Sequence, residues 1–232
     1  MSMHNELSEI QPDDGHPKKK RGRIFRFLLT GGPGAGKTAS ENWLIPALEN
    51  GDTTVLFIPE SATELISSKI TAAEIGDAAY QKKQLLLQLE KEKEAEQKAR
   101  RIAARGKNVL IFFDRGTLDG IAWWNQRDFD QMLFSMDLNE EKLRDRYDAV
   151  FHLESAACTD DRKYDRSTNA ARIASPKEAR DFDFRLRKIY QPHRHWKLIP
   201  SGADVDRKMD LLIDSIQKYS DQPGKESEKS AE

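Results

Sequence analysis

Residues 30–38 read TGGPGAGKT and directly follow the apolar run from Ile24 to Leu29. From Gly31 to Thr38 the stretch satisfies the pattern G-x-x-x-x-G-K-[ST], and a helix-forming sequence resumes after it. Glycines let the backbone curl until successive N–H groups point at one anion, and the start of the following helix adds the positive end of its dipole. The run of strand, loop and helix therefore predicts a P-loop that binds nucleotide phosphates.

Each part of this loop has an expected role. Lys37 supplies a positive charge for the β- and γ-phosphates of ATP or GTP, and the hydroxyl of Thr38 is expected on Mg²⁺. The alternative, a glycine-rich turn with an accidental Lys-Thr pair, leaves the flanking strand and helix unexplained. The residues expected to surround the phosphates are Gly32, Pro33, Gly34, Ala35, Gly36, Lys37, Thr38 and Ala39.

Composition limits the classes of function. The 232 residues carry 38 basic and 39 acidic side chains, so no global field recruits nucleic acid or an anionic membrane. The basic run at 18–21 is a solvated flank or, as the alternative, a local contact to phosphate or anionic lipid. No apolar stretch approaches the ~20 residues of a membrane helix, no secretory signal is recognised, and Cys158 has no partner for a disulfide. We therefore expect a cytoplasmic location.

Short apolar runs alternate with longer helical patterns. This alternation predicts a parallel sheet covered on both faces, that is, a three-layer α/β/α sandwich with five mostly parallel strands. We expect one domain over residues 23–219, with disordered tails at 1–22 and 220–232. The longest helix is expected from Thr71 to Arg105, with a solvated later half and Gly106 as its stop. The five predicted strands are Ile24–Leu29, Thr53–Ile58, Val109–Phe113, Ala149–Leu153 and Trp196–Ile199.

Two charged residues follow the third predicted strand. Asp114 lies where a P-loop protein holds Mg²⁺ through a carboxylate, and the alternative is that it caps the next helix. Arg115 suits a contact to a transferred or accepting phosphoryl group, and the alternative is a structural ion pair with Asp119. Asp114 is thus the carboxylate expected to hold Mg²⁺, and Asp114 and Arg115 are both candidate catalytic residues.

Glu60 follows the second predicted strand. Since ligands of open α/β sheets lie outside the carboxyl ends of the strands, Glu60 is expected to face the same crevice as Lys37 and Asp114. A carboxylate there can orient or deprotonate an acceptor hydroxyl. The alternative is a helix N-terminal acid beside a capping box of Ser61 and Glu64.

The segment 156–175 is expected to act as a lid. Arg162, Arg166 and Arg172 are its candidate phosphate-binding residues, and the alternative is a solvated loop, because aspartates are interspersed among them. A helix should then begin at Ser175 with a capping box and end by Pro192.

Three histidines and two tryptophans have an expected role in packing. His152, His193 and His195 share no metal-ligand spacing and are expected in the core or at its rim. One tryptophan of the Trp123-Trp124 pair is expected in the core, and the other is expected to form a stacking wall for a substrate ring.

The chain resembles the small AAA-type P-loop ATPase family related to nicotinamide-riboside kinase domains and to the animal TRPL translocation defect proteins. The resemblance covers roughly residues 24–218 and is most specific in the Pro-Glu after the second strand, in Asp-Arg-Gly-Thr after the third, and in Tyr164, Asn169 and Arg172. Two departures are Pro46, which should bend or shorten the first helix, and Ile199-Pro200-Ser201 where relatives often have Ile-Asp-Asn. The matching segments are TGGPGAGKT, IPESATELI, FFDRGTLDG, YDRSTNAARIASPKEARDFDFRL and PHRHWKLIPSGADVDRK.

The resemblance implies an NMP-kinase-like fold that binds ATP or GTP with Mg²⁺. We expect a kinase that transfers the γ-phosphoryl group of ATP to a small molecule, nucleoside or nucleotide, with Lys37 and Arg172 stabilising charge. The alternative is a regulatory NTPase read by a protein or lipid partner, since the animal relatives bind GTP and phosphatidic acid. A hexameric AAA motor is disfavoured, because the chain has no room for an additional helical domain. Neither the acceptor nor the oligomeric state follows from the sequence.

Overall fold

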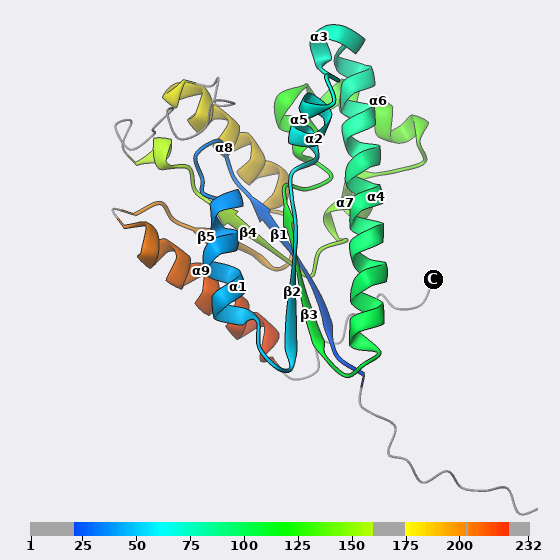
Figure 1. Cartoon of the computed structure of the whole chain (residues 1–232). Coiled ribbons are helices and arrows are strands. Elements are labelled where there is room, and N and C mark those ends of the chain that lie inside the picture. Colours follow the sequence, from blue (N-terminus) through cyan, green and yellow to red (C-terminus); the bar gives the residue numbers. More distant parts are fainter. Residues whose placement is uncertain (1–20, 160–174, 203, 223–232) are drawn as a thin grey trace, which may run out of the picture.

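A computed structural model of the chain describes residues 21–159, 175–202 and 204–222. Its centre is a five-stranded parallel sheet in the order β2-β3-β1-β4-β5 (Figure 1). All five predicted strands are confirmed, each to within a residue at either end. They are β1 (Ile24–Thr30), β2 (Thr53–Ile58), β3 (Asn108–Asp114), β4 (Ala149–Leu153) and β5 (Trp196–Ile199).

Helices cover both faces of the sheet and confirm the three-layer sandwich. Phe25, Phe27 and Leu29 of β1 pack on the face covered by α1 (Glu41–Leu48) and α9 (Val205–Ser220). Leu28 of the same strand packs on the opposite face, and Figure 1 shows α4 on that side and α1 with α9 on the other. The helices of the second face are α4 (Asp77–Ala103), α5 (Asp119–Trp123), α6 (Gln126–Ser135), α7 (Glu140–Arg144) and α8 (Pro176–Tyr190).

The helix predicted from Thr71 to Arg105 is in fact two helices. Gly76 has φ 82° and ψ 152°, a conformation that only glycine adopts readily, and it separates α3 (Ala72–Ile75) from α4. The expectation of a solvated later half is wrong, because Glu92, Ala95, Ala99 and Ala103 are all at most 4% exposed. Small alanine side chains one turn apart let this half of α4 approach the sheet closely. Most of the charged residues between them face solvent, but Glu96 pairs with the buried Arg26 of β1 at 2.9 Å.

Two other local predictions are confirmed. The side chains of Ser175 and Glu178 form the predicted capping box at the start of α8, with Pro176 in the first turn, and the helix ends at Tyr190. Helix α1 is only eight residues long and ends two residues after Pro46, as expected for a proline inside a helix.

The parallel strands bring four chain segments to one edge of the sheet. The P-loop follows β1 and leads through the short helix η1 (Thr38–Ser40) into α1, Glu60 lies between β2 and α2 (Ser61–Ser67), and Asp114 ends β3. The segment after β4 contains η2 (Ala156–Cys158). This shared edge is where ligands of open parallel sheets bind.

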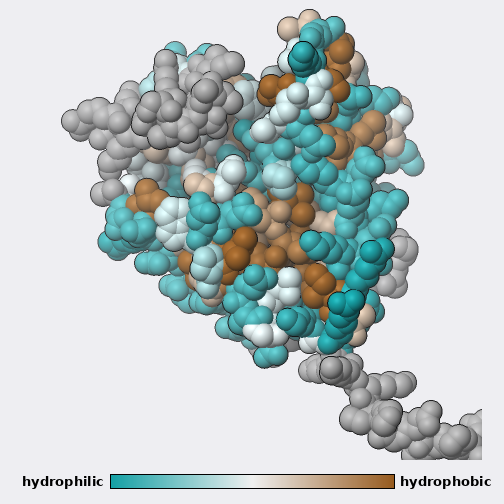
Figure 2. All heavy atoms as spheres, in the orientation of Figure 1, coloured by the Kyte–Doolittle hydropathy of each residue, from teal (hydrophilic) through white to brown (hydrophobic). Residues whose placement is uncertain are grey.

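One of the two outer strands of the sheet is β2. On the face drawn in Figure 2, hydrophobic side chains gather in the band between α1 and α4, where the half-buried side chains of β2 lie.

Within the described part of the chain, no helix has the length and hydropathy needed to span a bilayer.

Candidate functional site

The paired glycines at the start of the P-loop are required by close packing. A Cβ atom on Gly31 would lie 2.0 Å from the carbonyl oxygen of Leu153, and one on Gly32 would lie 2.8 Å from that of Ala179. The loop is therefore wedged between the end of β4 and the first turn of α8. Gly34 and Gly36 have φ values of 76° and 87°, which side chains other than that of glycine rarely allow.

The N–H groups of the loop divide into two sets. The N–H of Gly32 donates to Oδ1 of Asp183 at 2.9 Å, and Pro33 has no N–H, so in this arrangement these two residues shape the loop. Within the described ranges, no acceptor is assigned to the N–H groups of Gly34, Gly36 or Lys37. These three donors are thus available to an anion, whereas the N–H of Ala35, between Gly34 and Gly36, donates to the carbonyl oxygen of Gly32 at 3.2 Å.

Lys37 is folded back onto its own loop. Its ammonium donates to the carbonyl oxygens of Gly31 at 2.7 Å and Gly32 at 3.2 Å, and only 6% of the residue is exposed. Burial and then the charge of Arg115 lower the pKa of Lys37, although Asp114 and Glu60 act in the opposite direction. The ammonium has to leave these carbonyls to reach a phosphate.

Asp114 and Thr38 meet as the sequence pattern predicts for a metal site. The hydroxyl of Thr38 donates to Oδ2 of Asp114, while Oδ1 is buried without a hydrogen-bond partner. Burial raises the pKa of Asp114, and Lys37 and the Thr38 hydroxyl partly offset that rise. Asp114 does not cap α5, whose N-cap is Leu118.

This pair fits Mg²⁺, which takes oxygen ligands and keeps several waters and substrate phosphate oxygens around it. A buried carboxylate oxygen without a partner, next to a hydroxyl, is a suitable donor set. The described residues contain no group of three or more His, Cys, Asp or Glu side chains that would hold a metal by themselves. The ion would therefore be held jointly by Thr38, Asp114, phosphate and water.

Glu60 and Arg115 form an ion pair. Oε1 of Glu60 lies 2.6 Å from Nε of Arg115, and Oδ2 of Asp119 lies 3.9 Å from Nη1 of the same guanidinium. The arginine is held in a left-handed conformation, with φ 81°. The ion pair with Asp119 that we considered is therefore present but longer than the pair with Glu60.

The capping box considered for Ser61 and Glu64 is not formed. The Ser61 hydroxyl instead donates to Oε1 of Gln88 at 2.7 Å, and Glu64 pairs with Lys91 at 3.3 Å. Glu60 is the N-cap residue of α2, but its side chain accepts no capping hydrogen bond. Its carboxylate is thus directed to Arg115 and not to the helix.

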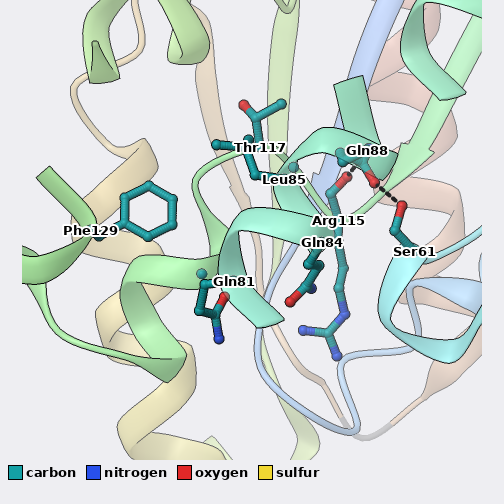
Figure 3. Close-up of a pocket in the computed structure, with 10 residues that line it drawn as sticks. Ser61, Gln81, Gln84, Leu85, Gln88, Arg115, Thr117 and Phe129 are labelled. Atoms are coloured by element: carbon teal, nitrogen blue, oxygen red, sulfur yellow. Dashed lines mark hydrogen bonds between the residues drawn. The ribbon is translucent and has the colours of Figure 1, made fainter. Parts of the chain in front are cut away.

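A pocket opens beside this ion pair (Figure 3). Gln88 connects two other lining residues, because it accepts from Ser61 and donates to the carbonyl oxygen of Arg115 at 3.2 Å. It also donates to Glu92, outside the pocket, at 3.1 Å. Gln81 is buried, and its Oε1 has no partner. The free volume is about 10 Å³, room for about one water. Main lining residues are Ser61, Gln81, Gln84, Gln88, Arg115 and Phe129.

The two tryptophans differ in burial, as expected. Trp124 packs against the buried cluster under the sheet, whereas Trp123 is 42% exposed and stacks on Phe182 with ring centroids 3.9 Å apart. The guanidinium of Arg115 lies 5.6 Å from the ring of Trp123. A half-exposed aromatic pair therefore lies next to the Glu60–Arg115 ion pair.

Sequence reasoning missed Asp183, which anchors the P-loop from α8. One carboxylate oxygen accepts from the N–H groups of Gly32 and Ser155, both at 2.9 Å, and the other lies 3.1 Å from Nε2 of His152. The sequence did carry a signal, because Asp183 lies on the apolar stripe of α8 between Ala179 and Leu186. His152 is fully buried, as predicted for a packing residue.

The expected lid arginines Arg162, Arg166 and Arg172 lie outside the described residues, together with Tyr164 and Asn169. The described parts of the expected lid are η2 with Thr159, and Ser175. The site described above consists of the P-loop, Glu60, Asp114, Arg115 and the pocket beside them.

Comparison with solved structures supports the fold. Deoxyadenosine kinase from M. mycoides with bound dATP matches with a TM-score of 0.55 and 14% identity, over 84% of this chain and 99% of that chain. NadR protein in complex with NR matches with a TM-score of 0.54 and 14% identity, over 87% of this chain and 52% of that chain. At such identities the likeness shows a shared fold. No curated protein matches the sequence.

The family assignment rests on the sequence itself. The family model described as an AAA domain matches residues 26–208. The matched range begins in β1, contains the whole P-loop, Glu60, Asp114 and Arg115, and ends in α9. The chain therefore belongs to this AAA domain family, a small P-loop family with an NMP-kinase-like fold.

Proposed function

We propose that this protein is a P-loop kinase that transfers the γ-phosphoryl group of ATP, with Mg²⁺, to a small acceptor such as a nucleoside or nucleotide. The observation that carries the proposal is the Glu60–Arg115 ion pair, at 2.6 Å, on the same edge of the sheet as Lys37 and Asp114. In a hydrolysing NTPase a polar side chain and an arginine near the phosphates orient water and stabilise charge; here the mostly buried Arg115 pairs with Glu60 and lines a pocket beside the phosphate site, where an acceptor can bind. A kinase needs such a carboxylate and arginine, to orient an acceptor and to neutralise charge.

Each residue then has a role in the transfer. The free N–H groups of Gly34, Gly36 and Lys37 hold the nucleotide phosphates, and the Lys37 ammonium moves from its own carbonyls onto them. Thr38 and Asp114 hold Mg²⁺, which when bound neutralises charge on the β- and γ-phosphate oxygens. Ala39 and the expected lid arginines, Arg162, Arg166 and Arg172, complete the proposed phosphate contacts.

Glu60 is the residue proposed to handle the acceptor. Its carboxylate orients the acceptor hydroxyl and takes up its proton as the bond to phosphorus forms. Arg115, which already neutralises Glu60 in the structure, lies ready to neutralise an acceptor phosphate or the transferred group. The exposed ring of Trp123, 5.6 Å from that guanidinium, is proposed to stack on a ring of the acceptor.

The pocket between α4 and the start of α5 is the proposed acceptor site. The buried, unpartnered Oε1 of Gln81 and the side chain of Gln84 offer hydrogen bonds to a polar ring or amide. Its free volume of about 10 Å³ is too small for such an acceptor, so the pocket has to open as the acceptor enters. Closure around the acceptor would then exclude water from the transferred phosphoryl group.

The test is a screen for an acceptor. The purified chain is incubated with Mg²⁺ and ATP, or GTP in parallel, and a pool of nucleosides, nucleotides and small metabolites, and products are identified by mass spectrometry. We expect one class of acceptor to gain a phosphoryl group, with a matching amount of ADP or GDP. Slow hydrolysis that no acceptor accelerates would favour the alternative, a nucleotide-dependent regulatory NTPase with a protein or lipid partner.

A further inference from the structure

A second lysine, Lys208 of α9, lies against the P-loop. Only 8% of the residue is exposed, and its ammonium donates to the carbonyl oxygen of Ala35 at 2.8 Å and to that of Glu154 at 2.6 Å. Ala35 is in the middle of the P-loop, and Glu154 directly follows β4. The ammonium therefore ties the loop to the end of a neighbouring strand.

The contact with Ala35 acts on the peptide group that the loop offers to an anion. The carbonyl of Ala35 and the N–H of Gly36 belong to one planar trans peptide, so they point in opposite directions. A cation on the carbonyl holds this peptide in one orientation and polarises it, which makes the N–H a stronger donor. The N–H of Gly36 is one of the three donors with no acceptor among the described residues.

If Lys208 only linked the carbonyl groups of Ala35 and Glu154, an uncharged hydrogen-bond donor would serve equally well. Burying an ammonium is costly unless its charge is used or paired, and the described residues include no carboxylate within salt-bridge distance of Lys208. The charge that would compensate best is a polyanion on the other side of the Ala35–Gly36 peptide. Bound there, it would face two ammonium groups, those of Lys37 and Lys208.

We propose that Lys208 is a positioning residue for the nucleotide, which orients the Ala35–Gly36 peptide for the phosphates and adds a second positive charge behind the P-loop. This inference rests on the proposed function, since it requires that the P-loop binds a polyphosphate. It goes beyond that function because it assigns a role to a residue of α9 that lies outside the P-loop motif.

The proposal makes the affinity for polyphosphate depend on pH. Burial lowers the pKa of Lys208 to about 8; Lys37 also lowers it, while Asp183 of α8, Glu154 after β4 and Cys158 of η2 raise it. A bound polyanion favours the protonated lysine, so affinity is full below pH 8 and falls as the pH rises through 8. If only Lys208 titrates, the affinity falls about tenfold between pH 7 and pH 9.

The test is calorimetric titration of the full chain with Mg²⁺ and ATP, and with Mg²⁺ and tripolyphosphate, at pH 7, 8 and 9. We expect Lys208→Met to bind both probes about tenfold or more weakly than wild type at pH 7, and to lose most of the decline toward pH 9. Lys218→Met is the matched control, because Lys218 is an exposed residue of the same helix. Lys208→Arg stays charged from pH 7 to pH 9. We expect it to bind both probes at pH 7 and to lose most of the decline in affinity toward pH 9.

Lys37 also has a lowered pKa, so the difference between the wild-type and variant profiles is the deciding quantity. Unchanged affinity in Lys208→Met, or weaker affinity with the full wild-type decline, would overturn the proposal and leave the proposed function intact. A wild-type protein that binds neither probe would overturn both. If Lys208→Met does not fold, Lys208→Arg decides: a decline as steep as that of wild type contradicts the role given to Lys208.

Discussion

At the scale of single residues, the charged groups of the site are each bound to another group of the protein. Lys37 binds two carbonyl oxygens of its own loop, Glu60 pairs with Arg115, and the Thr38 hydroxyl donates to Asp114. Each of these contacts has to be exchanged for a contact to nucleotide, Mg²⁺ or acceptor.

The first prediction concerns Lys37. In Lys37→Ala, the ammonium proposed to reach the β- and γ-phosphates is lost, so turnover should fall by about 10²-fold or more. The measurement is ADP formation with the acceptor found in the screen, together with the Kd for ATP. Lys218→Ala, at an exposed position, is the control for the loss of one lysine. A variant with wild-type affinity and turnover would show that the P-loop is not the phosphate site.

The second prediction separates the acceptor from the nucleotide. In Glu60→Gln the shape is kept but the carboxylate is lost, so acceptor-dependent kcat should fall by about 10²-fold to 10⁴-fold while the Kd for ATP stays near the wild-type value. The matched control is Glu64→Gln, in the first turn of the same helix, whose side chain is mostly exposed. Equal losses of ATP binding and turnover would instead indicate a structural role for Glu60.

The sequence predicted which residues meet at this edge of the sheet better than it predicted the residues that support them. The pattern from Gly31 to Thr38 and the strand ends at Glu60 and Asp114 identify residues that the fold brings to one edge. Asp183 and Lys208 were not identified: the place of Asp183 on the apolar stripe of α8 indicates burial, but the role of a buried charge follows only from the groups packed against it. Both residues act on the P-loop from helices far along the chain.

At the scale of helices and strands, the sequence predicted the strands from their apolar runs, but it did not predict the burial of α4 or the helix break at Gly76. The strands were found to within a residue because β1, β3 and β4 are buried on both faces and read as continuous apolar runs, while the partly buried edge strands β2 and β5 are still short apolar runs between helical segments. The burial of α4 was misjudged, since alanines among charged residues give a weak periodic signal although they pack closely. The break at Gly76 was missed because a glycine within a helical pattern does not reveal its φ value.

The third prediction tests that break. Gly76 has a positive φ with ψ near 150°, a combination that costs other residues about 1–3 kcal/mol, so Gly76→Ala should lower the free energy of unfolding by about this amount. The steric environment is open, because a Cβ atom there would meet no atom within 4 Å. Gly51→Ala is the matched control, with equally open space and no positive φ, and should change stability by less than about 0.5 kcal/mol.

The measurement is urea unfolding of both alanine variants and wild type. Equal effects of the two substitutions would mean that α3 and α4 can join into one continuous helix. That result would contradict the view that the glycine conformation sets the start of α4 at Asp77.

The fourth prediction concerns the connection of α8, β4 and the P-loop through Asp183. Burial alone raises the pKa of this carboxyl, but His152 and the N–H groups of Gly32 and Ser155 lower it below the ordinary value of 3.8 overall. A carboxylate with a lowered pKa stabilises the folded state fully above that ordinary value. The contribution is lost as the pH falls through the lower pKa of the folded state.

Asp183→Asn should therefore destabilise the protein by about 1–3 kcal/mol at pH 5, and the difference from wild type should shrink toward pH 3. Urea unfolding at the two pH values measures it, with the exposed Asp181→Asn of the same helix as control. A difference that stays constant with pH would show that the charge of Asp183 does not contribute.

At the scale of the whole molecule, the sheet order β2-β3-β1-β4-β5 puts β1 and the P-loop in the centre. The P-loop is then supported by β4 and α8 through Asp183 and by α9 through Lys208, while Asp114 comes from β3 and Glu60 from β2. Fold and family follow from the sequence together with this arrangement. The acceptor does not, because the pocket proposed for it beside Arg115 is lined by polar side chains together with Leu85 and Phe129, a combination that suits many small molecules.

The most direct measurement of the central claim is a crystal structure with Mg²⁺ and a non-hydrolysable ATP analogue at saturating concentration. We predict a phosphate within about 3.2 Å of the N–H groups of Gly34, Gly36 and Lys37, with the Lys37 ammonium moved from Gly31 onto its oxygens. An empty P-loop, with Lys37 still bound to the carbonyls of Gly31 and Gly32, would contradict the account.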